Sequence, residues 1–160
     1  MNRNATAIGM VLLLVIACRA QFQPASATEA CPVTTPTTEL APTPSPLDGY
    51  DPFPAGIIWY RNADRTIWAH PWEPWQARHD IKVGWIRPRG ARLAVNGQRL
   101  DRHAAPLQVG LPCCYPDHFQ ASGLTFPTAG CWVVQARAGQ SRLRFVVYVP
   151  PRRTLQKPGA

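Results

Sequence analysis

Turn residues divide the chain from residue 56 to residue 149 into short apolar segments, and this pattern is the feature that most limits its fold. No stretch of it keeps an amphipathic helical period for three turns. Strands are expected at 56–60, 66–70, 81–87, 92–95, 98–100, 107–111, 123–126, 131–136 and 142–149. Eight or so short strands in about a hundred residues are the usual content of an antiparallel β-sandwich, so the sequence predicts an all-β domain.

Two local patterns refine this expectation. In the last strand, apolar side chains alternate with polar ones, so one face is predicted to carry Leu143, Phe145, Val147 and Val149 and the other Arg142, Arg144 and Tyr148. The dipeptide Asn96-Gly97 lies between two apolar segments. It predicts a tight hairpin, because both central positions of a type I′ turn need positive φ.

The first residues are typical of a secretory signal, with Arg3 before a short apolar run at 7–17. That run is too short to span a bilayer, which takes about 20 residues. It ends in Val-Ile-Ala-Cys at 15–18, which resembles the bacterial lipoprotein signal, so the signal peptide 1–17 is expected to be removed and Cys18 to be acylated as a membrane anchor. Cleavage after Ala27, giving a secreted protein, and an uncleaved anchor helix are the alternatives. All three place the rest of the chain outside the cytoplasm.

Composition divides the remainder into three parts. Residues 18–54 are rich in Pro, Thr, Ser and Ala, and such a segment buries too little apolar area to fold by itself. A disordered linker stiffened by its prolines is expected there. The folded domain is predicted at 55–151, followed by a disordered tail at 152–160.

Several segments carry a family resemblance. The stretch 126–134, Phe-Pro-Thr-Ala-Gly-Cys-Trp-Val-Val, looks like the turn and penultimate strand of bacterial immunoglobulin-like domains. Together with 31–34, 83–88, 93–101 and 143–147, it makes the chain resemble a group of uncharacterised bacterial lipoproteins. The resemblance covers roughly residues 31–150 and implies an immunoglobulin-like antiparallel β-sandwich at the cell surface, without implying an activity.

Four cysteines remain if Cys18 is acylated: Cys31, Cys113, Cys114 and Cys131. In an oxidising compartment they can form up to two disulfides, in three connectivities. Strand alternation turns Cys131 away from the core, where a segment lying over the sheet could reach it. We favour Cys31–Cys131, which the resemblance also implies, with Cys113 and Cys114 as a second disulfide or thiol pair. The alternative joins Cys131 to Cys113 or Cys114 and Cys31 to the other one.

Cys113, Cys114 and His118 are also a candidate metal site. Thiolates and imidazole at this spacing could hold zinc or copper(I), which defines an alternative function in extracytoplasmic thiol or metal handling. Disulfides or buried thiols are the competing interpretation. No catalytic residue and no cofactor are predicted, because the sequence has no recognisable phosphate loop, Ser nucleophile elbow or pair of carboxylates.

Trp68, Trp72 and Trp75 form a second candidate site. Prolines at 71 and 74 argue against a regular central strand, so a loop is expected whose flat rings could bind a sugar or a polyproline segment. The competing interpretation is that these indoles cap the end of the sandwich as a satellite core.

Charge suggests the remaining partners. Fifteen of the 17 basic residues but five of the nine acidic ones lie beyond residue 54. Such a basic domain could bind an anionic envelope polymer or phospholipid headgroups. A glycan or another envelope protein are further candidates, and nucleic acid is not expected. The sequence therefore predicts a non-catalytic cell-envelope lipoprotein that displays an immunoglobulin-like binding or structural module.

Overall fold

The computed structural model describes residues 31–42, 53–112 and 115–152. Within these residues the chain forms eight strands and no helix, which confirms the all-β prediction. The strands are β1 (Tyr60–Arg61), β2 (Trp68–Pro71), β3 (Asp80–Ile86), β4 (Leu93–Arg99), β5 (Gln108–Gly110), β6 (Phe119–Thr125), β7 (Gly130–Ala138) and β8 (Ser141–Val149). Accordingly, none of the described residues belongs to a helix of the length and hydrophobicity that crossing a membrane requires.

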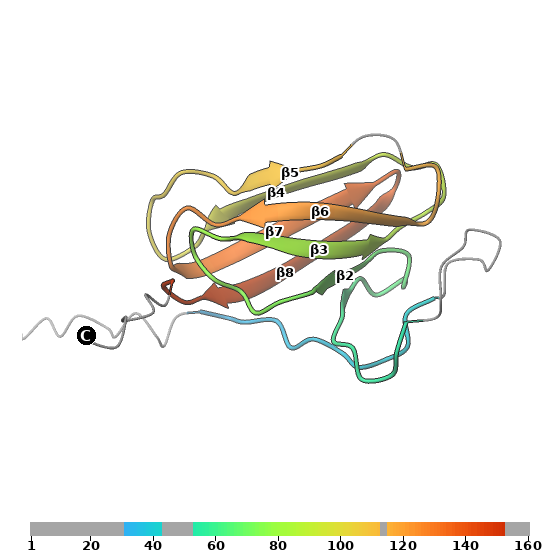
Figure 1. Cartoon of the computed structure of the whole chain (residues 1–160), viewed down its shortest axis with the longest axis horizontal. Helices are drawn as coiled ribbons and strands as arrows, with labels where there is room; N and C mark the ends of the chain where they lie inside the picture. Colours follow the sequence, from blue (N-terminus) through green and yellow to red (C-terminus); the bar gives the residue numbers. More distant parts are fainter. Residues whose placement is uncertain (1–30, 43–52, 113–114, 153–160) are drawn as a thin grey trace, which may run out of the picture.

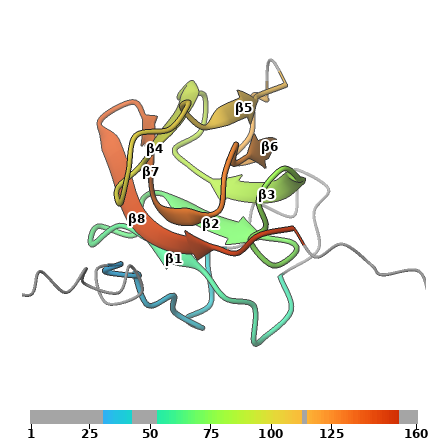
Figure 2. The ribbon, with the colours of Figure 1, turned by 90° about the vertical axis from the view of Figure 1, so that its left-hand side faces the viewer.

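The strands form two antiparallel sheets that enclose one core (Figures 1 and 2). The larger sheet has the order β1-β2-β3-β6-β5 and the smaller one the order β4-β7-β8. The two sheets come together at both sides of the sandwich, where β1 contacts β8 and β4 contacts β5. The architecture is a two-sheet β-sandwich.

The core between the sheets follows the predicted alternation. The inward residues of β3, β7 and β8 are all buried: Ile81, Val83, Trp85, Trp132, Val134, Ala136, Leu143, Phe145, Val147 and Val149. Two buried indoles also satisfy their polar atoms, which burial otherwise makes costly. Trp85 Nε1 donates to Ser122 Oγ at 2.8 Å, and Trp132 Nε1 donates to the Thr128 carbonyl oxygen at 3.0 Å.

The predicted hairpin at Asn96-Gly97 is wrong. Both residues lie inside the continuous strand β4, where Asn96 pairs with Gln135 and Gly97 with Val134. Gly97 serves close packing, because an added Cβ would lie 2.9 Å from Leu107 Cδ2. The tight turn is instead Gly139-Gln140, which joins β7 to β8. Gly139 has a φ of 60°, and glycine at the first central position is typical of type II′ turns.

Trp68–Pro71 is strand β2, which agrees with the strand expected at 66–70 and not with the loop expected for Trp68. Pro71 is tolerated there because its ring nitrogen points away from β3. The next amide, Trp72 N–H, donates to the Lys82 carbonyl oxygen on the β3 side at 3.0 Å. On the opposite side, β1 pairs only with the first two residues of β2, so the proline removes no ladder hydrogen bond.

Residues 31–37, here called the N-terminal strap, pack on the sandwich, whereas the composition of 18–54 predicts a disordered linker there. Thr34 N–H donates to the Val146 carbonyl oxygen, and Val146 N–H donates to Thr34 Oγ1, each at 2.9 Å. Thr37 exchanges backbone hydrogen bonds of 2.8 and 2.7 Å with Trp59. The strap thus runs from β8 to the residue before β1, along the junction of the two sheets (Figure 2). The predicted signal peptide, the remaining linker at 18–30 and 43–52, and the tail from residue 153 lie outside the described residues.

Candidate functional site

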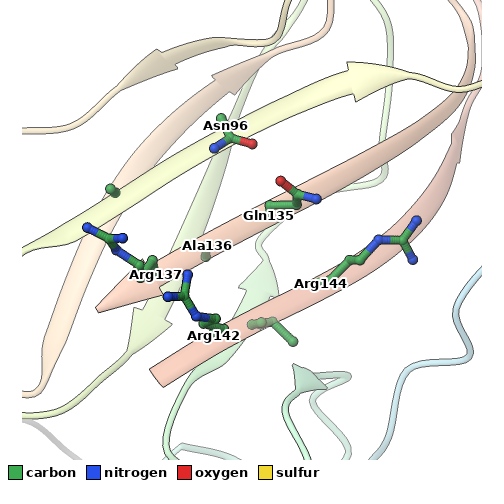
Figure 3. A pocket seen from close by; sticks show the side chains of 8 residues that line it. Asn96, Gln135, Ala136, Arg137, Arg142 and Arg144 are labelled. Carbon is green, nitrogen blue, oxygen red and sulfur yellow. The ribbon is translucent and has the colours of Figure 1, made fainter. Parts of the chain in front are cut away.

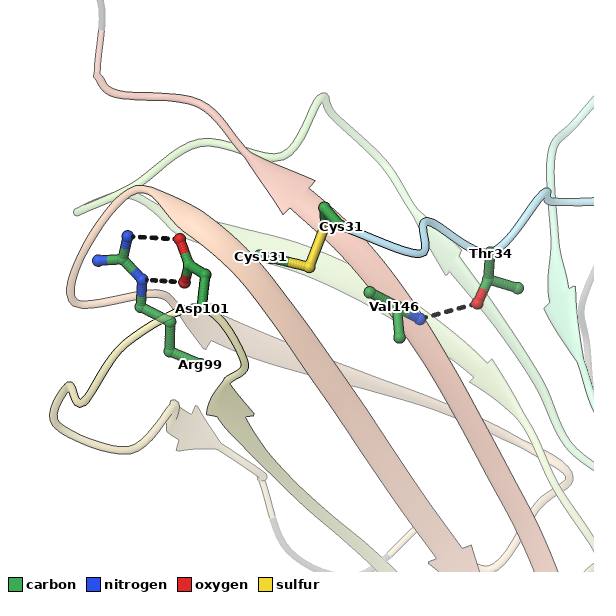
Figure 4. Close-up of a disulfide and its surroundings, with 6 residues drawn as sticks. All are labelled: Cys31, Thr34, Arg99, Asp101, Cys131 and Val146. Carbon is green, nitrogen blue, oxygen red and sulfur yellow. Dashed lines mark hydrogen bonds and ion pairs between the residues drawn. A yellow bond between two sulfur atoms is a disulfide. The ribbon is translucent and has the colours of Figure 1, made fainter. Parts of the chain in front are cut away.

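A disulfide fixes the strap to the smaller sheet. Cys31 is bonded to Cys131, with their Cα atoms 5.5 Å apart, which confirms the favoured pairing (Figure 4). Cys131 lies on the outer face of β7, as its alternation predicts, and is nevertheless only 2% exposed. It is covered because Cys31 packs on Cys131, Val133 and Val146 in a small apolar cluster. The strap therefore covers the outer face of the smaller sheet at Cys131, Val133 and Val146, whereas Tyr148 on the same face stays 47% exposed.

An ion pair lies next to the disulfide (Figure 4). Arg99 donates from Nε to Asp101 Oδ1 at 2.6 Å and from Nη2 to Asp101 Oδ2 at 2.9 Å. The guanidinium group keeps the pKa of Asp101 below its ordinary value, and the carboxylate raises the pKa of Arg99. Arg99 Nη1 also donates to Thr128 Oγ1, so this side chain joins the end of β4 to the turn before β7. Its charge is satisfied within the protein.

The part of this outer face nearer the Gly139-Gln140 turn is open and basic. Cross-strand register places Asn96, Gln135 and Arg144 in one row and Ala94, Arg137 and Arg142 in the next. All six side chains line a hollow of about 470 Å³ on the surface, together with Ala136 and Leu143 (Figure 3). We call Arg137, Arg142 and Arg144, with Asn96 and Gln135, the arginine face.

Arg137 and Arg142 face each other directly across β7 and β8. Both backbone polar groups of Val146 bond to the strap, so Val133 and Val146 are a non-hydrogen-bonded pair of the antiparallel ladder. Arg137 and Arg142 lie four residues further along the two strands and share this geometry. Facing Cα atoms in such pairs are about 4.5 Å apart. Figure 3 shows the two side chains next to each other, with Arg144 further along β8.

The arginine face has no internal counter-charge. Across the described ranges, none of its three guanidinium groups makes a hydrogen bond or an ion pair. The carboxylate of Glu39 is bound by Arg61 at 2.9 Å and by Arg65 at 3.0 Å. All three arginines of the face are exposed, so their charge is presented to solvent.

Arg87 is a buried charged residue that sequence reasoning missed. It is 2% exposed and donates from Nε to Gln120 Oε1 at 2.9 Å and from Nη2 to the Tyr115 carbonyl oxygen at 2.6 Å. Burial lowers the pKa of its guanidinium group. The alternation of β3 could have indicated that Arg87 is buried, because residue 87 continues the inward-facing series 81, 83 and 85. Its contacts are structural, as it holds the segment around Tyr115.

The candidate metal site can be placed only in part. Cys113 and Cys114 lie outside the described residues. His118 is described, and its Nδ1 lies 3.1 Å from the Arg87 carbonyl oxygen. Among the residues that the structure places, no group of three or more His, Cys, Asp or Glu side chains could hold a metal ion. The alternative pairing of Cys131 with Cys113 or Cys114 is not found, because Cys131 is bonded to Cys31.

The three tryptophans do not form one exposed platform. Trp68 is 1% exposed and packs with Trp59 and Ile86 on the outer face of the larger sheet. Trp75 packs against the main core, with Nε1 donating to Tyr60 Oη at 3.4 Å. Trp72 alone of the three is exposed, at 53%. The structure corrects the platform hypothesis, because alternation on β2 directs Trp68 into a satellite cluster.

The other polar side chains near β2 have partners within the protein. His79 Nε2 lies 2.8 Å from Glu73 Oε2, a contact that lowers the pKa of Glu73. His70 Nδ1 lies 2.8 Å from the Ile58 carbonyl oxygen. These contacts fix loops beside β2 and β3, whereas the arginine face keeps its charge unpaired. Comparison of the chain with protein-family models, with curated proteins and with solved structures finds no match.

Proposed function

We propose that the chain is a cell-envelope lipoprotein, anchored through an acylated Cys18, whose domain is a non-catalytic immunoglobulin-like binding or structural module. The observation that carries the proposal is the Cys31–Cys131 disulfide. It ties the segment that follows the expected anchor to the middle strand of the smaller sheet. Disulfides of this structural kind persist mainly outside the cytoplasm, which supports an extracytoplasmic location.

Strand order supports the immunoglobulin-like assignment. The sequence β2-β3-β6-β5 in the larger sheet corresponds to strands A-B-E-D of a constant-type immunoglobulin domain, and β4-β7-β8 corresponds to C-F-G. The chain departs from antibody domains in its disulfide, which lies on the outer face of β7 and not between the sheets. Trp85 and Trp132 occupy the core between the sheets instead.

The connection of the domain to its anchor supports a display role. A mechanical force transmitted through an anchor at Cys18 would reach the domain at Cys31, thirteen residues further along the chain. The disulfide passes that force to β7, which is paired along its length with β4 on one side and β8 on the other. This force therefore does not act directly on the hydrogen bonds that join the strap to Val146 and Trp59. A membrane-tethered domain that must hold a partner under load benefits from this arrangement.

Contacts of the titratable groups favour binding over catalysis. Glu39, Glu73 and Asp101 each pair with a cation or histidine that ties together neighbouring loops or strands. The arginine face, by contrast, has donors for a ligand, and none of its residues is placed as an acid, base or nucleophile. A surface of this kind recognises a partner by charge and hydrogen bonding.

Membrane attachment tests the proposal. The full chain and two variants, Cys18→Ser and the matched control Cys113→Ser, are expressed in a bacterial host with a clickable fatty-acid analogue. We expect label and membrane-fraction localisation for the wild-type and control proteins, and loss of both for Cys18→Ser. A Cys18→Ser protein that is still labelled and still sediments with membranes would refute the anchor. A soluble wild-type protein beginning at Thr28 would show secretion instead.

A further inference from the structure

We infer that the arginine face binds an extended polyanion with phosphodiester repeats, a ligand class that rests on the envelope location proposed above. Three guanidinium groups on β7 and β8 line one surface hollow with the side-chain amides of Asn96 and Gln135. A guanidinium group presents a planar fork of N–H donors that binds two phosphate oxygens at once. The amides add donors for phosphate or hydroxyl oxygens of the same ligand.

Repulsion between Arg137 and Arg142 destabilises the ligand-free protein, and a bound anion would reduce this repulsion. Like charges directly opposite each other across an antiparallel pair destabilise it, and Arg137 faces Arg142 in the closer type of pair. Arg61 and Arg99, which also lie on strands, each have a carboxylate partner, Glu39 and Asp101 respectively. No described carboxylate is placed within ion-pair distance of the arginine face. A bound phosphate would supply the missing counter-charge.

The composition of the face favours an extended polymer over a folded protein partner. Stable protein interfaces have an apolar or aromatic centre surrounded by a polar rim. Here the centre consists of Gln135, Arg137, Arg142 and Arg144, and the hollow has about 470 Å³. That volume suits one or two units of a polymer. On the same outer face, Cys131, Val133 and Val146 are already covered by the strap, and Tyr148 is the exposed aromatic side chain near them.

Position along the hairpin favours a ligand away from the anchoring membrane. Cys131 pairs with Tyr148 at one end of β7 and β8, whereas Arg137 pairs with Arg142 at the other end. Six residues of strand separate these positions, or about 20 Å. The chain enters the domain at the disulfide, so the arginine face lies at the far end of the hairpin. This placement favours a polymer over the headgroups of the membrane that holds Cys18.

The test measures binding of a fluorescent synthetic poly(glycerol phosphate) to the full chain in detergent, by anisotropy across a salt series. A triple variant, Arg137→Gln, Arg142→Gln and Arg144→Gln, is compared with a control of equal charge change, Lys82→Gln, Arg102→Gln and Arg152→Gln. Three contacts predict a slope of log affinity against log salt near −2, at about 0.7 per contact. We expect the arginine-face variant to lose this slope and at least about tenfold in affinity. The control keeps both.

Three further arms make the outcome decisive. Polyglutamate in the same assay, and phosphatidylglycerol vesicles of matched charge with the non-acylated Cys18→Ser chain in detergent-free buffer, should bind more weakly than the phosphate polymer. Stronger binding of either would overturn the assignment. Replacing the three arginines by lysine should weaken binding several-fold, because lysine lacks the fork. Equal losses in the two glutamine variants would show attraction to net charge alone. Should the triple variant misfold, Arg142→Gln alone, which removes the like-charge pair, gives the same comparison.

Two results separate polymer binding by the arginine face from lipidation of Cys18. A chain with acylated Cys18 that does not bind the polymer refutes the ligand and leaves the lipoprotein proposal intact. A chain that binds the polymer through these arginines but carries no lipid supports the site and refutes the anchor.

Discussion

Removing the Cys31–Cys131 disulfide should destabilise the whole sandwich and not only the strap. The bond closes a loop with a sequence separation of 100 residues. Loop-closure entropy for such a loop is about 4.7 kcal/mol. We expect a loss of ~4 kcal/mol, because measured contributions of disulfides usually fall somewhat below this entropic value. For a domain of this size, that loss corresponds to a fall in Tm of ~15 °C.

Differential scanning calorimetry of the full chain, with and without reductant, measures this loss. The variant Cys31→Ala/Cys131→Ala should match the reduced wild-type protein and should not respond to reductant. The control Cys113→Ser/Cys114→Ser keeps the Cys31–Cys131 bond, so reductant should lower its Tm by as much as it lowers that of the wild-type protein.

A small effect would refute the reasoning. If reduction lowers Tm by less than ~3 °C, the strap contributes little to the cooperative unit and detaches without unfolding the sheets. If reductant lowers Tm in Cys31→Ala/Cys131→Ala but not in Cys113→Ser/Cys114→Ser, the stabilising bond involves the adjacent cysteines.

Three further outcomes are expected. Thr34→Val removes the acceptor of Val146 N–H and should cost ~1–3 kcal/mol in urea unfolding, whereas the exposed control Thr35→Val should cost less than ~0.5; equal costs would contradict the strap's role. Gly97→Ala places a Cβ 2.9 Å from Leu107 and should cost ~1–3 kcal/mol, whereas at Gly110 the nearest atom is 3.9 Å away and the change should cost less. Arg99 lowers the pKa of Asp101 below its ordinary 3.8, so the unfolded state takes up this proton first. The pair therefore stabilises the fold above pH 3.8, and its contribution is lost as pH falls through the folded pKa; thermal unfolding from pH 5 to pH 2 should show a shallower decline for Asp101→Asn, and an unchanged decline would contradict this.

Strand alternation predicted the sandwich well because burial on one face imposes a period of two. The inward series of β3, β7 and β8 and the outward Cys131 follow from it directly. It failed where a second layer covers the sheet. Val133 and Val146 have outward parity but are buried, because the strap lies over them. A segment rich in Pro and Thr has no local signal for such docking, which depends on the distant Cys131 and Val146.

The turn-forming residues of the sequence did not by themselves predict where the hairpin forms, because packing also determines it. Asn96-Gly97 has the residues of a hairpin, yet it lies in a strand because Gly97 is needed for the close approach of Leu107. The arginine face also depends on pairing that composition does not show. Arg137, Arg142 and Arg144 could be placed outward from the sequence, but the facing of Arg137 and Arg142 follows from the turn at Gly139-Gln140. Recognising that dipeptide as the hairpin would have predicted the pair.

The central claim is a disulfide-locked sandwich displayed on a lipid anchor, and mass spectrometry of the full chain isolated from membranes without reductant tests it most directly. We expect an N-terminal peptide that begins at acylated Cys18 and a second, cross-linked peptide pair that contains Cys31 and Cys131. An N-terminus at Met1 or Thr28 without lipid, or Cys31 recovered as a free thiol, would contradict it.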